Sequence, residues 1–291
     1  MMEAFHSNWT VPSFEGSRGE HYYIEDFEIL TTILSALKWR ENNGDIKMVT
    51  DERGAEYYKN LGIESIWNLG IDVSLDNGID KDIDPKIFWA AGKIYSLKRQ
   101  KTPCAMIDTD FIVWKPVEEI LVDSKICIIH KENISEEIYP DKEYFNMKNN
   151  YKFDNEWDWL EKPCNTAFTY IADEEFRKYY VDSAIDFMKS TISGDDRLKN
   201  MVFAEQRLIS MCAKKMGITI DELTDLDALF KNEQTYFTHI WGFKREMKKD
   251  FLQRSEFCIR CIKRIIEDFP EYEEVIASMK QLAYFYKQYK G

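Results

Sequence analysis

The chain has 291 residues, of which 44% are hydrophobic and 14% aromatic, enough apolar side chains for a sizeable folded core. Its formal net charge of -13 gives no general attraction to phosphate backbones or anionic lipid, so we expect no nucleic-acid partner. The first residues lack the basic and then apolar run of a signal peptide, and no apolar stretch is long enough to span a bilayer. We therefore expect a cytoplasmic protein without a transmembrane segment.

The first two-fifths of the chain alternates strand and helix patterns. Strands are expected at 4–9, 46–50, 63–69, 104–107, 111–114 and 126–129, and helices at 20–40, 54–61 and 85–99. This alternation predicts an α/β fold with a mixed, mainly parallel sheet flanked by helices. Ligands of such sheets gather at the carboxyl ends of the strands, where Asp51 and Asp108 lie. We therefore expect both aspartates to face a bound cofactor.

The rest of the chain is mostly helical. Helices are expected at 173–190, 203–216 and 245–288, with a strand near 236–241. The segment 139–163 is polar but rich in aromatic residues, and it is predicted to be an irregular insertion. We divide the chain into an α/β domain, residues 1–244, and a helical C-terminal extension, residues 245–291, packed on it.

The six cysteines give little sign of chemistry. The one CxxC pair, Cys258 and Cys261, has no second cysteine pair or histidine pair to complete a zinc site, and it falls in a helical pattern. Burial as small core residues is therefore favoured over redox or metal chemistry.

Asp108 and Asp110 form the strongest candidate site. Side chains two residues apart on an extended chain point the same way, and paired carboxylates suit a hard divalent cation. Acidic pairs at this spacing also occur at 80–84 and 225–227, but in polar surroundings. Only Asp108 and Asp110 lie between two apolar strands, where carboxylates are costly unless something compensates them. The pattern favours a metal site over a pair with purely structural hydrogen bonds.

The segment 106–116 (MIDTDFIVWKP) resembles the DxD segment of GT-A-fold glycosyltransferases. It is most similar to the group that contains the glycogenin-like and galactosyltransferase enzymes, the capsular-polysaccharide mannosyltransferase-like proteins and the clostridial glucosylating toxins. The resemblance implies a GT-A-like fold and a nucleotide-sugar donor. It also implies that Asp110 binds Mn²⁺ or Mg²⁺ directly, and that Asp108 contacts the ribose or the metal shell.

Two further segments are similar to motifs of this group. Residues 6–9 (HSNW) match an HxxW motif, in which Trp9 would stack on uracil; a core aromatic at the end of a strand is the alternative. Residues 238–244 (THIWGFK) match an HxxGxxK motif, which implies that His239 completes the metal shell and that Gly242 and Lys244 face the diphosphate. Lys244 comes one residue early, and a core histidine is the alternative for His239.

The donor-sugar side of the site is expected around residue 205. Residues 204–208 (AEQRL) are similar to an acidic-Gln segment of the group, which implies that Glu205 or Gln206 supports the developing oxocarbenium charge. An acidic residue in the first turn of a helix is the alternative. Asn165 matches an asparagine that touches donor or acceptor hydroxyls. The helix before the DxD departs from the pattern, because Lys93 stands where an arginine is usual.

The resemblance implies a metal-dependent, retaining glycosyltransferase that moves a sugar from a nucleotide-sugar, with UDP-sugar favoured, to a glycan or another acceptor. One rival is a non-catalytic carbohydrate- or nucleotide-binding protein, in which Trp157 and Trp159 stack on sugars. The other rival is a haloacid-dehalogenase-type phosphohydrolase, with Asp108 as nucleophile and residues 194–196 (GDD) as the later acidic motif.

The segment 244–266 is basic in an otherwise acidic chain, with eight basic against three acidic residues. A basic amphipathic helix can rest on the inner face of a membrane. A packed helix with a solvated basic face is the alternative.

Overall fold

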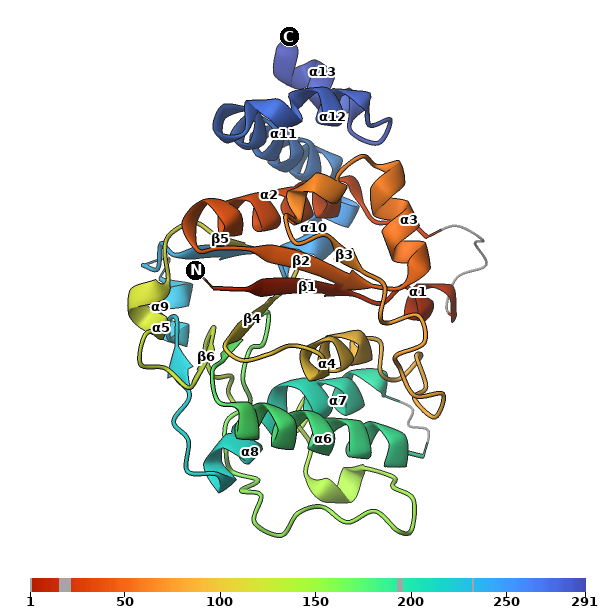
Figure 1. Cartoon of the computed structure of the whole chain (residues 1–291), viewed down its shortest axis with the longest axis vertical. Helices are drawn as coiled ribbons and strands as arrows, with labels where there is room; N and C mark the ends of the chain where they lie inside the picture. Colours follow the sequence, from red (N-terminus) through yellow and green to blue (C-terminus); the bar gives the residue numbers. More distant parts are fainter. Residues whose placement is uncertain (1, 16–21, 193–195, 232) are drawn as a thin grey trace.

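The computed structural model describes residues 2–15, 22–192, 196–231 and 233–291, and its elements are labelled in Figure 1. The strands are β1 (Ala4–Asn8), β2 (Ile46–Thr50), β3 (Ile71–Asp72), β4 (Cys104–Ile107), β5 (Phe111–Val113), β6 (Ile126–Ile128), β7 (Phe168–Ile171), β8 (Asp221–Glu222) and β9 (Phe237–His239). The helices are α1 (Val11–Glu15), α2 (Asp26–Asn42), α3 (Glu52–Asn60), α4 (Ala91–Lys98), α5 (Glu118–Leu121), α6 (Glu174–Ser190), α7 (Arg197–Val202), α8 (Leu208–Lys215), α9 (Leu226–Phe230), α10 (Phe243–Lys249), α11 (Phe251–Asp268), α12 (Glu273–Ser278) and α13 (Ala283–Lys290).

The main sheet has seven strands in the order β3-β2-β1-β4-β7-β6-β8. β1 pairs in parallel with β2 and β4, and β7 runs antiparallel between β4 and β6. A second, two-stranded sheet pairs β5 with β9. The predicted fold class, a mixed and mainly parallel α/β sheet flanked by helices, is confirmed.

Alternation along the strands builds a separate core on each face of the sheet. In β4, Ala105 and Ile107 face one core, while Cys104 and Met106 face the other. The period of two follows from the pleat, which turns successive side chains to opposite faces. In Figure 1, α2, α3 and the C-terminal helices lie above the sheet, and α4, α6, α7 and α8 lie below it.

The C-terminal segment is not the continuous helix predicted for 245–288. It folds as α10 to α13, and the division at residue 244 falls inside α10. α11 buries Cys258 and Ile262 in the same core as α2. Arg254 adds two ion pairs to the start of α2, at 2.7 Å from Asp26 and 2.9 Å from Glu25. Residues 245–291 are therefore packed on the α/β part through a shared core.

Two predicted elements of the α/β part differ from the structure. The strand predicted at 63–69 is wrong, because Glu64–Ile66 form a 3₁₀ turn and the strand follows as Ile71–Asp72. The helix predicted at 85–99 begins only at Ala91, after a series of turns. The sequence reading also missed β7, the antiparallel strand beside β4.

The aromatic segment 139–163 is irregular, as predicted, but its tryptophans do not form a sugar platform. Trp157 is 7% exposed and donates from Nε1 to the Tyr179 hydroxyl at 3.0 Å. Trp159 stacks on Phe203, with ring centroids 5.4 Å apart. Both side chains pack against the core of the lower layer, so the rival role of sugar stacking has no support from their position.

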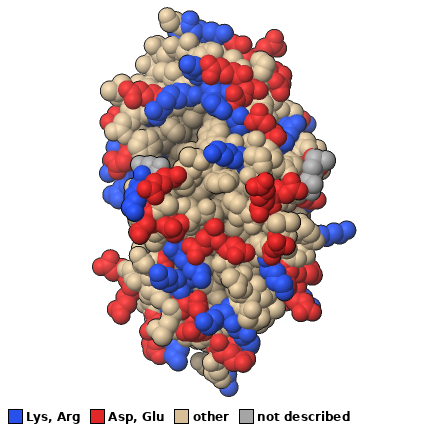
Figure 2. All heavy atoms as spheres, turned by 90° about the vertical axis from the view of Figure 1, so that its left-hand side faces the viewer, with Lys and Arg blue, Asp and Glu red and all other residues tan. Residues whose placement is uncertain are grey.

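All six cysteines are buried and free. Among the described residues, no helix is both long enough and apolar enough to cross a membrane. Basic and acidic side chains are mixed on the face seen in Figure 2. In the basic segment, Lys244 and Arg254 are held in ion pairs while Lys248 and Lys249 are exposed, and membrane contact through 244–266 stays a prediction.

Candidate active site

The DxD segment forms a tight turn between β4 and β5. The amide of Asp108 donates to the carbonyl of Ala167 at 2.8 Å, which continues the pairing of β4 with β7. The amide of Phe111 then donates back to the carbonyl of Asp108 at 3.0 Å and closes the turn. Asp108 and Asp110 are therefore placed at the carboxyl end of a buried central strand, as predicted.

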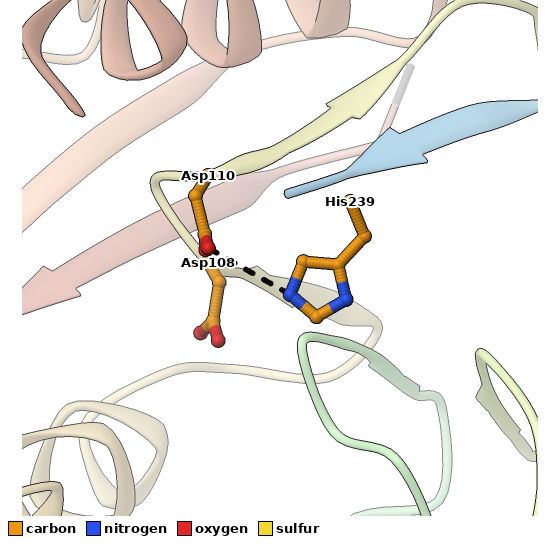
Figure 3. Close-up of side chains that lie close together, drawn as sticks. All are labelled: Asp108, Asp110 and His239. Atoms are coloured by element: carbon orange, nitrogen blue, oxygen red, sulfur yellow. Dashed lines mark ion pairs between the residues drawn. The ribbon is translucent and has the colours of Figure 1, made fainter. Parts of the chain in front are cut away.

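His239 is brought to the same turn by the small sheet. β9 pairs antiparallel with β5 so that His239 lies opposite Phe111. Its Nε2 is 3.8 Å from Oδ2 of Asp110 (Figure 3). One ligand atom from each of Asp108, Asp110 and His239 lies within 4.8 Å of the other two. The three predicted metal ligands are thus close together in space.

The protonation states of these groups suit a divalent cation. Burial lowers the pKa of His239 to about 4, so the imidazole is neutral and keeps a lone pair for a metal. Burial raises the pKa of Asp108 to about 6, which still leaves it ionised at neutral pH. Burial also opposes the ionisation of Asp110, but the ammonium of Lys244 holds the pKa of Asp110 below its usual range. Two carboxylates and one imidazole fit Mn²⁺ or Mg²⁺.

Lys93 links the DxD turn to the donor-sugar side. Its ammonium lies 2.6 Å from Oδ1 of Asp108 and 2.7 Å from Oε1 of Glu205. Burial alone would lower the pKa of the Lys93 ammonium. The two carboxylates raise this pKa by a larger amount, so that it lies above its ordinary range. Glu205 also accepts from the hydroxyl of Thr166 at 2.9 Å. The carboxylate of Glu205 is therefore fixed in place by two donors.

Glu205 projects from a π-helical turn, Phe203–Arg207, between α7 and α8. Turns of this kind are rare and are frequent at functional sites. Gln206 in the same turn accepts from the hydroxyl of Tyr139 at 2.7 Å. Glu205 and Gln206 therefore lie in an irregular turn at the site, and not in the first turn of an ordinary α-helix.

Lys244 enters from α10 on the opposite side. Its ammonium lies 2.9 Å from Oδ2 of Asp110 and 3.3 Å from Oε1 of Glu28, a residue in the first turn of α2. The basic group predicted to face a diphosphate therefore reaches the candidate metal site, although it comes one residue early in the motif.

A cavity of about 810 Å³ surrounds these groups. Most of the predicted site residues line it: Trp9, Lys93, Asp108, Asp110, Asn165, Glu205, Gln206, His239 and Lys244. Asn165 precedes β7, so the antiparallel direction of that strand places it at the carboxyl end of β4. Its Nδ2 donates to Glu132 at 3.1 Å.

Trp9 follows β1 and is packed against the start of α4. A Cβ added at Gly92 would lie only 2.6 Å from Cβ of Trp9. This close approach explains why a glycine precedes Lys93, and it positions the tryptophan on the cavity wall.

Two predicted site residues lie elsewhere. Asp51 is buried as the N-cap of α3, where its carboxylate accepts from the amides of Thr10 and Gly54 at 2.7 and 2.9 Å. Gly242 is exposed at the N-cap of α10 and does not line the cavity. The position of Asp51 at the end of a strand led to the prediction that it contacts a cofactor. In the structure Asp51 instead caps a helix and does not line the cavity.

The rival phosphohydrolase motif is only partly described. Gly194 and Asp195 lie outside the described residues. Asp196 accepts from the amide of Leu198 at 3.0 Å and caps α7.

The sequence reading missed Trp89, Glu132, Arg197 and Trp241, which also line the cavity. Arg197 lies over the ring of Trp89, 5.5 Å from its centroid. The side chain of Trp241 is 73% exposed. Its place inside the 238–244 motif is the one signal that would have singled it out.

Comparison with known proteins identifies the family. The model of a family of unknown function, DUF6734, matches residues 2–279, so the chain belongs to that family. No protein with a curated description matches the chain in sequence.

Several solved structures are similar in fold. Mouse xyloside xylosyltransferase 1 is 10% identical over 76% of this chain and 84% of that chain, with a TM-score of 0.41. The PaToxG glycosyltransferase is 10% identical over 74% and 69%, with a TM-score of 0.39. The inositol-1-phosphate CTP transferase of T. maritima is 16% identical over 77% and 85%, with a TM-score of 0.37. At these values the likeness is limited to the general course of the chain.

Proposed function

We propose that this protein is a metal-dependent glycosyltransferase that uses a nucleotide-sugar. The proposal is supported mainly by one observation: Asp108, Asp110 and His239 lie close together at the carboxyl end of β4, beside a cavity of about 810 Å³. Cavities of this size hold small molecules and cofactors, and strand ends are where open α/β sheets bind them.

Asp110 and His239 would hold Mn²⁺ or Mg²⁺, with Asp108 between the metal and the ribose. When bound, such a cation neutralises charge on the departing diphosphate. The neutral imidazole of His239 and the ionised carboxylate of Asp110 supply donor atoms without a proton having to leave first.

The nucleotide would lie between Trp9 and the DxD turn. The Trp9 ring offers a stacking surface for a base, and UDP is the nucleotide that the motif resemblance favours. Lys93 and Lys244, on opposite sides of the aspartates, are the cations available to the diphosphate. Each is a point charge, which suits phosphate oxygens without fixing their orientation.

The donor sugar would lie toward Asn165, Glu205 and Gln206. Lys93 and Thr166 hold the carboxylate of Glu205 in place, which supports a role in stabilising positive charge on the sugar ring rather than in taking a proton. We therefore propose retention of the anomeric configuration. The acceptor is a glycan or another hydroxyl compound that enters past Trp241 and Arg197.

Thermal-shift screening of a nucleotide-sugar panel, with and without Mn²⁺, tests this proposal. A UDP-sugar should raise the melting temperature, and Mn²⁺ should increase that shift. A panel in which no nucleotide-sugar changes the melting temperature, alone or with metal, would contradict it. A non-catalytic binding protein would show the shift but leave the donor uncleaved, and a phosphohydrolase would release phosphate from sugar phosphates without a nucleotide.

A further inference from the structure

Lys244 occupies a position that conflicts with a metal on Asp110. Its Nζ lies 2.9 Å from Oδ2 of Asp110, the same oxygen that faces Nε2 of His239 at 3.8 Å. A cation on that oxygen would lie about 2.1 Å from it, and hence within about 5 Å of the ammonium. The side chain of Asp110 is 8% exposed, so solvent screens this repulsion poorly.

The ammonium of Lys244 has a second anionic partner close by. Oε1 of Glu28 lies 3.3 Å from Nζ, and the Lys244 side chain is 31% exposed. A small rotation of a flexible four-carbon chain is enough to move the charge between Asp110 and Glu28. Lys93 is held more tightly, because its ammonium lies closer to both of its carboxylates, at 2.6 and 2.7 Å, and its side chain is only 18% exposed.

We propose that Lys244 couples metal binding to diphosphate binding. Without a nucleotide, the ammonium neutralises Asp110 and keeps its affinity for a divalent cation low. When a diphosphate enters, the ammonium moves to the phosphate oxygens and leaves Oδ2 of Asp110 to the cation. Metal and diphosphate then bind with positive cooperativity, which by linkage is equal in both directions. The identity of the diphosphate as part of a nucleotide-sugar rests on the proposed function.

The binding of Mn²⁺ to the whole protein, followed by electron paramagnetic resonance with and without UDP, tests the coupling. Lys244→Met should raise the Mn²⁺ affinity of the nucleotide-free protein by a factor of about 5 to 150, the usual range of site couplings. The same variant should lose most of the gain in Mn²⁺ affinity that UDP gives the wild type. Lys248→Met, on the same helix with a side chain 52% exposed, is the matched control and should behave as the wild type.

Glu28→Gln gives a second, independent arm. The glutamine keeps a side-chain oxygen that can accept from the amide of Glu25 in the capping box at the start of α2. It removes the negative charge that is the second partner of the Lys244 ammonium. Lys244 is then held more firmly on Asp110, so the Mn²⁺ affinity without nucleotide should fall. This arm decides the question if Lys244→Met does not fold.

The outcomes separate this inference from the proposed function. An Mn²⁺ affinity of nucleotide-free Lys244→Met at or below that of the wild type would overturn the coupling. So would the absence of any effect of UDP and of inorganic pyrophosphate on Mn²⁺ affinity in the wild type. If pyrophosphate raises the Mn²⁺ affinity and UDP does not, the coupling through Lys244 stands and the nucleotide-sugar proposal fails.

Discussion

Glu205 and Lys93 are joined by an ion pair of 2.7 Å, although 112 residues separate them in the sequence. The pair connects the π-helical turn before α8 to the start of α4, and through Lys93 to Asp108 at 2.6 Å. One ammonium therefore lies between two largely buried carboxylates in the cavity and offsets one of their two negative charges. We expect the stability of the fold to depend on this arrangement.

Replacement of Lys93 should destabilise the fold. Lys93→Met leaves Asp108 and Glu205 near each other without a cation, and the free energy of unfolding should fall by about 3 kcal/mol. Lys98→Met, at the exposed end of the same helix, should change it by less than about 0.5 kcal/mol. Urea unfolding at neutral pH measures both. Equal stability of the two variants would show that the ion pair contributes nothing.

Loss of a metal ligand should weaken Mn²⁺ binding. Asp110→Asn and His239→Gln should each lower the affinity measured with UDP present by at least about tenfold, since each removes one of the three candidate ligands. Asp82→Asn is the control, because Asp82 belongs to acidic pairs of the same spacing in an exposed loop. An equal effect of Asp82→Asn and Asp110→Asn would mean that Mn²⁺ binds acidic surface at random.

Metal binding should weaken as the pH falls through about 6. Burial raises the pKa of Asp108 to about 6, so a proton competes for this carboxylate below that pH. His239, with a pKa lowered to about 4, stays neutral over the same range. Mn²⁺ titrations of the wild type at pH 7.5 and 5.5 should therefore differ, and Asp108→Asn should lose most of the difference. A pH dependence that persists unchanged in Asp108→Asn would assign it to another group.

Acid should destabilise the fold through His6. This side chain is fully buried between Ser35 and Trp67, at 3.0 and 3.1 Å, and burial lowers its pKa to about 3. The unfolded chain binds a proton near pH 6.5 while the folded one does not, so stability is lost as the pH falls below 6.5. At pH 4.5 the loss should be about 2 to 3 kcal/mol relative to pH 7.

His6→Gln isolates this contribution from that of the other titrating groups. The variant should lose less stability than the wild type between pH 7 and pH 4.5, by that same amount, in urea unfolding. Parallel pH profiles for the two proteins would contradict the assignment to His6.

Local pattern was enough to predict much of the fold. β2 and β4 have the predicted limits, because short apolar runs bounded by polar residues have few alternatives to strands. β7 was missed, although it is the central antiparallel strand. Its residues 168–171 (FTYI) are of the aromatic and β-branched types that favour strands, but its antiparallel pairing with β4 and β6 depends on long-range contacts.

The site was predicted less completely, for a physical reason. Asp51 and Asp108 both follow strands of the same sheet, but one caps a helix and the other lies in the cavity. The sequence around them does not show which backbone amides lie within reach. The pairs of Lys93 with Glu205 and of Lys244 with Asp110 likewise depend on how distant elements pack.

The most direct test of the central claim is release of UDP from UDP-sugars by the purified protein, because transferases of this kind pass donor slowly to water. We predict release that requires Mn²⁺ or Mg²⁺, stops when the metal is chelated, and falls at least a hundredfold, ~3 kcal/mol of barrier, in Asp110→Asn. The matched Asp82→Asn variant should release UDP at the wild-type rate. Release that is independent of metal, or equal in Asp110→Asn and the wild type, would contradict the account.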